Sequence, residues 1–266
     1  MKKFFVILTI IICAAAIIVG NLHWKNKITA HSKVVANTEK VNSETQVVEE
    51  EKVEIITIDV TSYAARLPES VQNKIKTAQS TGKPLNLVIY GSDATSDQAG
   101  AWPSQLKAEL ESTYGTEIFK VTIISEGNQT TLDVVQERSY EEVTELKPDI
   151  VLFEPFMLKD NSGLIGFPNT IANIETMMES WKSTNESVTI MMQPPNPLFS
   201  ADYYPKEVIQ LQDYAEANDI IYLNHWEAWP DLEDIKMKSY LTEKNDVNED
   251  GNNLWANYLI EYFIQK

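Results

Sequence analysis

From Val53 to the C-terminus, short runs rich in valine, isoleucine and leucine alternate with longer amphipathic patterns, and this alternation constrains the fold most. Short apolar runs bounded by turn residues are typical of buried strands. Regular strand–helix–strand order implies right-handed crossovers and a parallel sheet covered on both faces. We therefore expect an α/β fold, a flavodoxin-like three-layer sandwich with a five-stranded parallel sheet. The predicted strands are Leu85–Tyr90, Ile118–Ile124, Asp149–Glu154, Val188–Met192 and Ile220–Leu223.

The helices predicted between these strands carry apolar side chains about one helical turn apart. In the first of them Trp102, Leu106, Leu110 and Tyr114 are spaced four apart, and Gly115 ends the pattern. The predicted helices are Trp102–Tyr114, Thr131–Leu146, Thr170–Trp181, Pro205–Asn218 and Leu254–Ile264.

The first 52 residues lack this alternation and fall into two parts. An apolar run from Phe4 to Val19 has lysines on both sides, which is typical of a membrane anchor or a secretory signal. We expect residues 1–27 to form an uncleaved anchor that leaves the domain outside the cell; the alternative is a cleaved signal and a secreted protein. Residues 28–52 are polar and predict a disordered stalk, so the folded domain is expected over residues 53–266.

Charge and cysteine content exclude several classes of function. The formal net charge of −17 argues against a nucleic-acid partner, because phosphate binding needs clustered lysine and arginine. The one cysteine, Cys13, lies in the apolar run, so the domain has neither a disulfide nor a cysteine-based zinc site. We expect no cofactor. The acidic side chains also lack a spacing that supports a metal site.

In a parallel sheet, ligands bind outside the carboxyl ends of the strands. The loop after the first predicted strand reads Gly91-Ser92-Asp93-Ala94-Thr95 and resembles the G-D-S-x-T block of the SGNH (GDSL-like) hydrolases. Gly127 resembles the glycine of that family's second block, and Asn161 could supply the asparagine of its third. The segment before the final helix resembles the last block through Asn248, Gly251, Leu254 and Trp255. The resemblance extends over most of residues 53–266 and implies an ester hydrolase or acyl transferase.

The chain departs from the family pattern at the positions that carry the chemistry. Asp93 stands where the serine nucleophile belongs, and Ser92 where the aspartate belongs. Glu243 stands at the aspartate of the D-x-x-H pair and Asp246 at the histidine. A carboxylate normally has too low a pKa to take a hydroxyl proton well at neutral pH.

Ser92 and Asp93 each have a catalytic and a structural interpretation. Ser92 could be a nucleophile displaced by one position, or a turn serine that bonds to the local backbone. Asp93 could be a nucleophile or a metal ligand, or it could stabilise the turn as an Asx residue.

His225 is the domain's only imidazole and follows the fifth predicted strand. It could replace the missing base, or it could pack against Trp226 and Trp229. Gly127 and Asn161 could donate to an oxyanion, or they could be ordinary turn residues.

Two functions follow from these patterns. The first is a membrane-tethered extracellular hydrolase that acts on a glycan or lipid ester of the cell envelope, with weak activity. Its catalytic set would be Ser92 or Asp93, helped by His225 or Asp246, with Gly127 and Asn161 at the oxyanion. The second is a non-catalytic module that keeps the fold and binds a cell-surface glycan or a protein partner in the same cleft.

Overall fold

The computed structural model describes residues 60–265. The chain divides into two units, and these residues belong to the second, Thr57–Lys266. The expected anchor (1–27) and stalk (28–52) lie outside the described residues. Within the described part of the chain, no helix is both long enough and apolar enough to cross a bilayer.

A five-stranded, all-parallel sheet forms the centre of the domain, as the sequence predicts. The strand order is β2-β1-β3-β4-β5. The strands are β1 (Leu85–Gly91), β2 (Phe119–Ser125), β3 (Ile150–Phe153), β4 (Thr189–Met192) and β5 (Ile221–Tyr222). The α/β class and the flavodoxin-like strand order are therefore confirmed.

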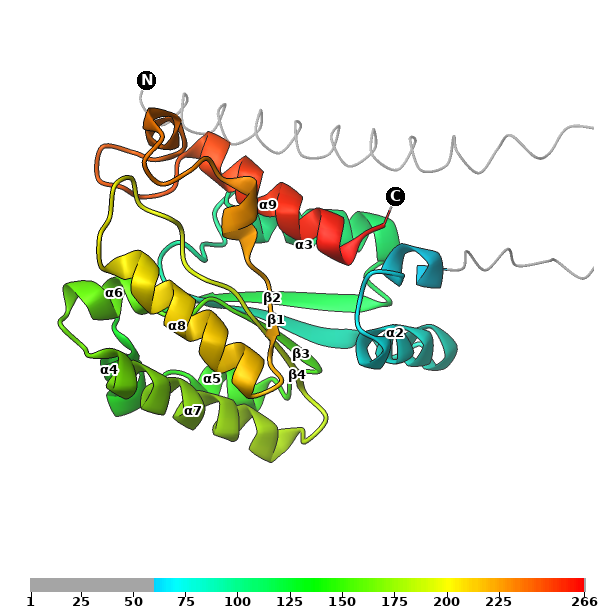
Figure 1. The fold of residues 1–266 in the computed structure, drawn as a ribbon. Helices are drawn as coiled ribbons and strands as arrows, with labels where there is room; N and C mark the ends of the chain where they lie inside the picture. The colour runs from blue at the N-terminus through cyan, green and yellow to red at the C-terminus, as the bar shows by residue number, and fades with distance from the viewer. Residues whose placement is uncertain (1–59, 266) are drawn as a thin grey trace, which may run out of the picture. The chain divides into compact units, whose positions relative to one another are not determined.

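Helices cover both faces of the sheet (Figure 1). Strand β1 shows why, because its side chains alternate between two apolar cores. Leu87 and Ile89 pack into the core shared with α2, α3 and α9, whereas Val88 and Tyr90 pack into the core shared with α5, α7 and α8. The α-helices are α2 (Glu69–Thr81), α3 (Trp102–Tyr114), α4 (Thr131–Glu137), α5 (Glu141–Glu145), α6 (Met157–Ser162), α7 (Phe167–Thr184), α8 (Tyr204–Ala217) and α9 (Glu249–Phe263). The short 3-10 helices are η1 (Val60–Ala64), η2 (His225–Ala228) and η3 (Ile235–Tyr240).

The predicted helices differ from the observed ones mainly at their ends. The helix predicted over Thr131–Leu146 is two helices, because Arg138 adopts a left-handed conformation (φ 58°) between α4 and α5. Helix α9 begins five residues earlier than predicted, since the Asn248 side chain accepts a hydrogen bond from the Gly251 amide (3.0 Å) and caps it. Helices α2 and α6 were not among the predicted helices, and α6 forms one wall of the site described next.

Candidate functional site

An open cleft of about 930 Å³ lies at the carboxyl end of the sheet, where the sequence places the site. Its walls come from four segments far apart in the chain: the loop after β1, helix α6, the loop after β4, and the segment that leads into α9. The lining residues used below are Asp93, Ala94, Lys159, Asn196, Asn245 and Asp246.

The Ser92 side chain points away from the cleft and into the protein. Its hydroxyl lies 2.9 and 3.0 Å from the two carboxylate oxygens of Glu154, and its backbone N–H donates to the same carboxylate at 2.8 Å. Thr95 adds a further hydroxyl bond to Glu154, also at 2.8 Å. Ser92 is only 3% exposed and does not line the cleft. In this position it stabilises the turn, but mainly through the distant Glu154 carboxylate and not only through the local backbone that the structural interpretation expects.

Glu154 follows β3 directly and is completely buried. Burial raises the pKa of its carboxyl to about 8, although the hydrogen bonds from Ser92 and Thr95 act in the opposite direction. Gly91 is required beside it, because a Cβ at that position would overlap the Glu154 carboxylate and the Thr95 hydroxyl. The turn after β1 is thus built around this one carboxyl group.

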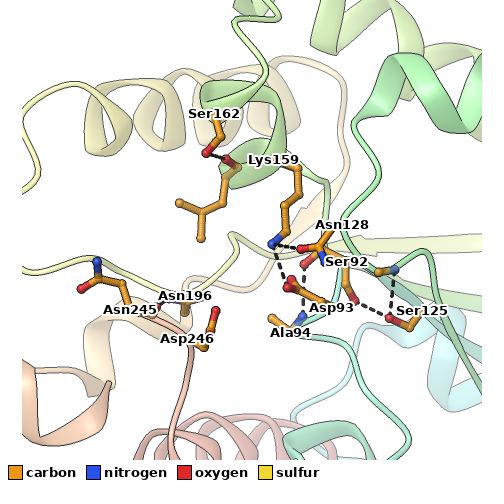
Figure 2. Close-up of polar contacts among 12 residues, drawn as sticks. Ser92, Asp93, Ala94, Ser125, Asn128, Lys159, Ser162, Asn196, Asn245 and Asp246 are labelled. Carbon is orange, nitrogen blue, oxygen red and sulfur yellow. Dashed lines mark hydrogen bonds and ion pairs between the residues drawn. The ribbon is translucent and has the colours of Figure 1, made fainter. Parts of the chain in front are cut away.

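Asp93 faces the cleft from the position that the family pattern gives to the nucleophile (Figure 2). Its carboxylate pairs with the ammonium group of Lys159 at 2.8 Å, and Lys159 also donates to Asn128 at 2.9 Å. The Asp93 N–H donates to the carbonyl of Gly127 at 2.8 Å, which holds the turn against the loop after β2. Asp93 is therefore an accessible carboxylate held in an ion pair.

Asp246 lines the opposite wall, and Figure 2 shows Asp246 and Asp93 on either side of the same space. A short antiparallel bridge between Leu241 and Val247 shapes this wall. Asn196 ties the wall to the loop after β4, because its amide donates to the Asn245 carbonyl at 3.3 Å. The structure thus brings Asp93 and Asp246 to one cleft, as the sequence predicts.

The structure corrects the interpretation of His225 as a base and agrees with the alternative of packing against Trp229, because the imidazole lies in the core and not at the cleft. Its ring is fully buried and stacks on Trp255 at a centroid distance of 3.9 Å. Nε2 lies 2.8 Å from the Pro194 carbonyl, and Nδ1 accepts a hydrogen bond from Trp229 at 3.0 Å. Burial lowers the pKa of His225 to about 3. With both ring nitrogens engaged inside the protein, the imidazole has no route to a proton in the cleft.

The expected oxyanion donors do not face the cleft either. The Gly127 N–H points to the Ser125 hydroxyl (3.3 Å), and Gly127 is a turn glycine with φ 62°. The Asn161 amide donates to Glu207 on α8 at 3.0 Å. Neither residue lines the cleft. This placement corrects the expectation of oxyanion donors: the face of α6 that lines the cleft carries Lys159 and Ser162, and Asn161 is not on it.

Within the described residues, the acidic side chains do not gather into a metal site. The buried Asp160 carboxylate accepts hydrogen bonds from Thr131 and Thr170, and these bonds join α6 to α4 and α7. Across residues 60–265, no three histidine, cysteine or acidic side chains converge in a way that could hold a metal ion.

The sequence interpretation missed Glu154 and Lys159, which determine the geometry of the turn. Glu154 is the last residue of a predicted strand, so its position at the sheet edge was available as a signal. Lys159 gave no signal, because the short helix that carries it is not visible in the apolar pattern.

No protein-family profile matches the chain, and neither does any curated protein sequence. Solved structures do match. A carbohydrate esterase of family 3 from Talaromyces cellulolyticus is 13% identical (TM-score 0.56; 66% of this chain, 95% of that one). An acetylxylan esterase from Geobacillus stearothermophilus is 13% identical (TM-score 0.55; 67% and 94%). A GDSL-like lipase from Bacteroides thetaiotaomicron is 15% identical (TM-score 0.50; 72% and 96%). At this level of identity the likeness defines architecture: the chain has the fold of the SGNH (GDSL-like) hydrolases.

Proposed function

We propose that the domain is a sugar-binding module on a hydrolase fold, which holds a cell-surface glycan in the cleft between Asp93 and Asp246. One observation carries the proposal: the groups of a serine hydrolase are turned away from the cleft. The Ser92 hydroxyl is bound to Glu154, and the His225 imidazole is buried under Trp255. A serine becomes nucleophilic only beside a base that can take its proton in contact with the substrate.

The chemistry of the lining supports a sugar as the ligand. Sugars present many hydroxyl groups, each of which donates and accepts hydrogen bonds. Carboxylates accept such bonds, an ammonium donates them, and amides do both. Asp93, Lys159, Asn245 and Asp246 supply these three kinds of group around one open space.

We expect the full chain to bind a short neutral oligosaccharide, and Asp246→Ala to weaken that binding about tenfold or more, because a hydrogen bond to a charged group contributes about 1.5–3 kcal/mol. Titration calorimetry with xylotetraose, acetylated xylotetraose and chitotetraose tests this expectation. Asp213→Ala is the matched control, since Asp213 is exposed on α8 and does not line the cleft. Equal affinities for both variants would refute the placement of the sugar.

A feeble ester hydrolase is the second candidate, because Asp93 and Asp246 reach one cleft with Lys159 beside them. A carboxylate can activate a water, although weakly at neutral pH. The structural likeness to esterases supports this reaction class without naming a substrate.

Chromogenic short-chain esters separate the two candidates. We expect turnover by the wild type close to background, with Ser92→Ala and His225→Ala leaving it unchanged when they fold. Asp93→Ser combined with Asp246→His should stay weak, because Gly127 and Asn161 do not face the cleft as oxyanion donors. Rapid wild-type turnover that is lost in Asp93→Asn would establish the carboxylate hydrolase instead.

We propose further that residues 1–27 tether the domain to the cell membrane, with the domain outside. The apolar run and its flanking lysines support this proposal. We expect the intact chain in the membrane fraction, and its domain should be digested when protease is added to whole cells. Shortened protein in the medium would show that the leader is cleaved.

A further inference from the structure

We propose that Glu154 is a positioning residue of the cleft: its buried carboxyl fixes the turn that carries Asp93, and its protonation alters how tightly the cleft binds a sugar. The second half rests on the proposed sugar-binding function. The first half rests on contacts within the protein alone.

The hydrogen bonds to the Glu154 carboxylate all come from the turn after β1. Each hydrogen bond to its carboxylate is donated by Ser92 or Thr95, the residues on either side of the Asp93–Ala94 pair. Gly91, one step earlier, has no space for a side chain because Glu154 occupies it. A carboxyl group that holds both ends of a turn also determines where the middle of that turn points.

Within residues 60–265, the ion pairs do not include Glu154. The titratable groups that interact with it are Asp93 in the turn and Tyr204 on α8, and Asp93 is itself paired with Lys159 on α6. A buried carboxylate without a cationic partner is costly to ionise. Burial therefore raises the pKa of Glu154 to about 8.

Protonation changes which group donates and which accepts in the hydrogen bonds of the turn. The ionised carboxyl accepts from the Ser92 N–H, the Ser92 hydroxyl and the Thr95 hydroxyl. When Oε1 carries a proton, it donates to the Ser92 oxygen, 3.0 Å away. Of the two Glu154 oxygens, only Oε2 then remains as an acceptor for the Ser92 hydroxyl, at 2.9 Å, and Oε2 also accepts from the Ser92 N–H and the Thr95 hydroxyl. The change occurs one residue from Asp93.

The sign of the effect on binding follows from charge. A bound sugar removes water from Asp93 and so strengthens the repulsion between the Asp93 and Glu154 carboxylates. Binding therefore favours neutral Glu154, and the affinity should fall as the pH rises through about 8, the pKa of Glu154. Coupling between neighbouring sites is typically about fivefold or more.

The variant Glu154→Gln is the sharpest test, because it fixes the neutral form. The glutamine oxygen can accept from the Ser92 N–H and the Thr95 hydroxyl, while its amide donates to the Ser92 oxygen. The control is Asp160→Asn, since Asp160 is also a buried carboxyl but bonds to Thr131 and Thr170, away from the turn.

The first measurement needs no ligand. In the full chain labelled with ¹³C-aspartate, we expect the Asp93 carboxyl resonance, assigned by Asp93→Asn, to show an inflection near pH 8. It should persist in Asp160→Asn and vanish in Glu154→Gln. A wild-type resonance that is flat from pH 6 to 9 overturns the positioning role, whether or not a sugar binds.

The second measurement is the affinity for the xylotetraose or chitotetraose probe between pH 6 and 9. We expect it to weaken about fivefold in the wild type and to stay constant in Glu154→Gln. The same pH profile in both proteins overturns the coupling while leaving sugar binding established. If neither probe binds at any pH while the Asp93 inflection depends on Glu154, then the sugar proposal and its coupling fail and the positioning role stands.

Discussion

Replacing Trp255 with alanine should lower the free energy of unfolding by about 3–5 kcal/mol, the usual cost of removing a large buried aromatic side chain. Trp255 lies between the rings of Trp102 and His225, with centroid distances of 4.8 and 3.9 Å. It is fully buried, and its indole N–H donates to the Gln193 side-chain oxygen at 2.9 Å. The substitution therefore leaves a cavity and an unpaired buried oxygen together.

Urea unfolding of the full chain, followed by far-UV circular dichroism, measures this loss without depending on tryptophan fluorescence. Tyr203→Ala is a suitable control, because Tyr203 is 76% exposed and a surface substitution changes stability by about 0.5 kcal/mol at most. If Trp255→Ala cost no more than Tyr203→Ala, the stack of rings would not be part of the core.

The sequence was sufficient to predict the sheet and the location of the site. Strands β1 to β4 lie within one residue of their predicted ends because a buried parallel strand needs a short apolar run, which is a local property. Asp93 and Asp246 were both expected at the cleft because they align with the serine and histidine positions of the family pattern. Helices α4 and α5 were read as one helix, since the left-handed conformation of Arg138 has no signature of its own.

The orientation of the site side chains could not be predicted. His225 was expected at the sheet edge from its position after β5, but whether a side chain there faces the cleft or the core depends on packing against Trp255 and Trp229. The case of Glu154 is similar. In the family pattern a carboxylate stands at position 92, whereas here a serine at 92 receives a carboxylate from β3, 62 residues away in sequence. This contact depends on the strand order: β1 and β3 are neighbours in the sheet, so the residue after β3 lies beside the turn after β1.

The same buried groups predict how stability depends on pH. The pKa of Glu154 rises from 4.5 to about 8 in the folded protein because of burial. The neutral form of Glu154 therefore stabilises the folded protein. This contribution to the unfolding free energy is complete below pH 4.5 and is lost as the pH rises toward 8. The pKa of His225 falls from 6.5 to about 3, also because of burial. Its contribution is complete above pH 6.5 and is lost as the pH falls toward 3.

Between pH 4.5 and 6.5 the two effects oppose each other, so we expect maximal stability there. Outside that window each group alone should change the unfolding free energy by up to about 1.4 kcal/mol per pH unit. Burial also raises the pKa of Asp160 above its usual 3.8, so its contribution to stability likewise falls as the pH rises above that value. Urea titrations of the full chain at several pH values should show that Glu154→Gln flattens the limb above pH 6.5 and leaves the acid limb intact. His225→Gln should flatten the acid limb and leave the limb above pH 6.5 intact, when each limb is measured from the variant's own lower maximal stability. If the alkaline limb kept its slope in Glu154→Gln, the buried carboxyl would be ionised without cost, and its raised pKa would be wrong.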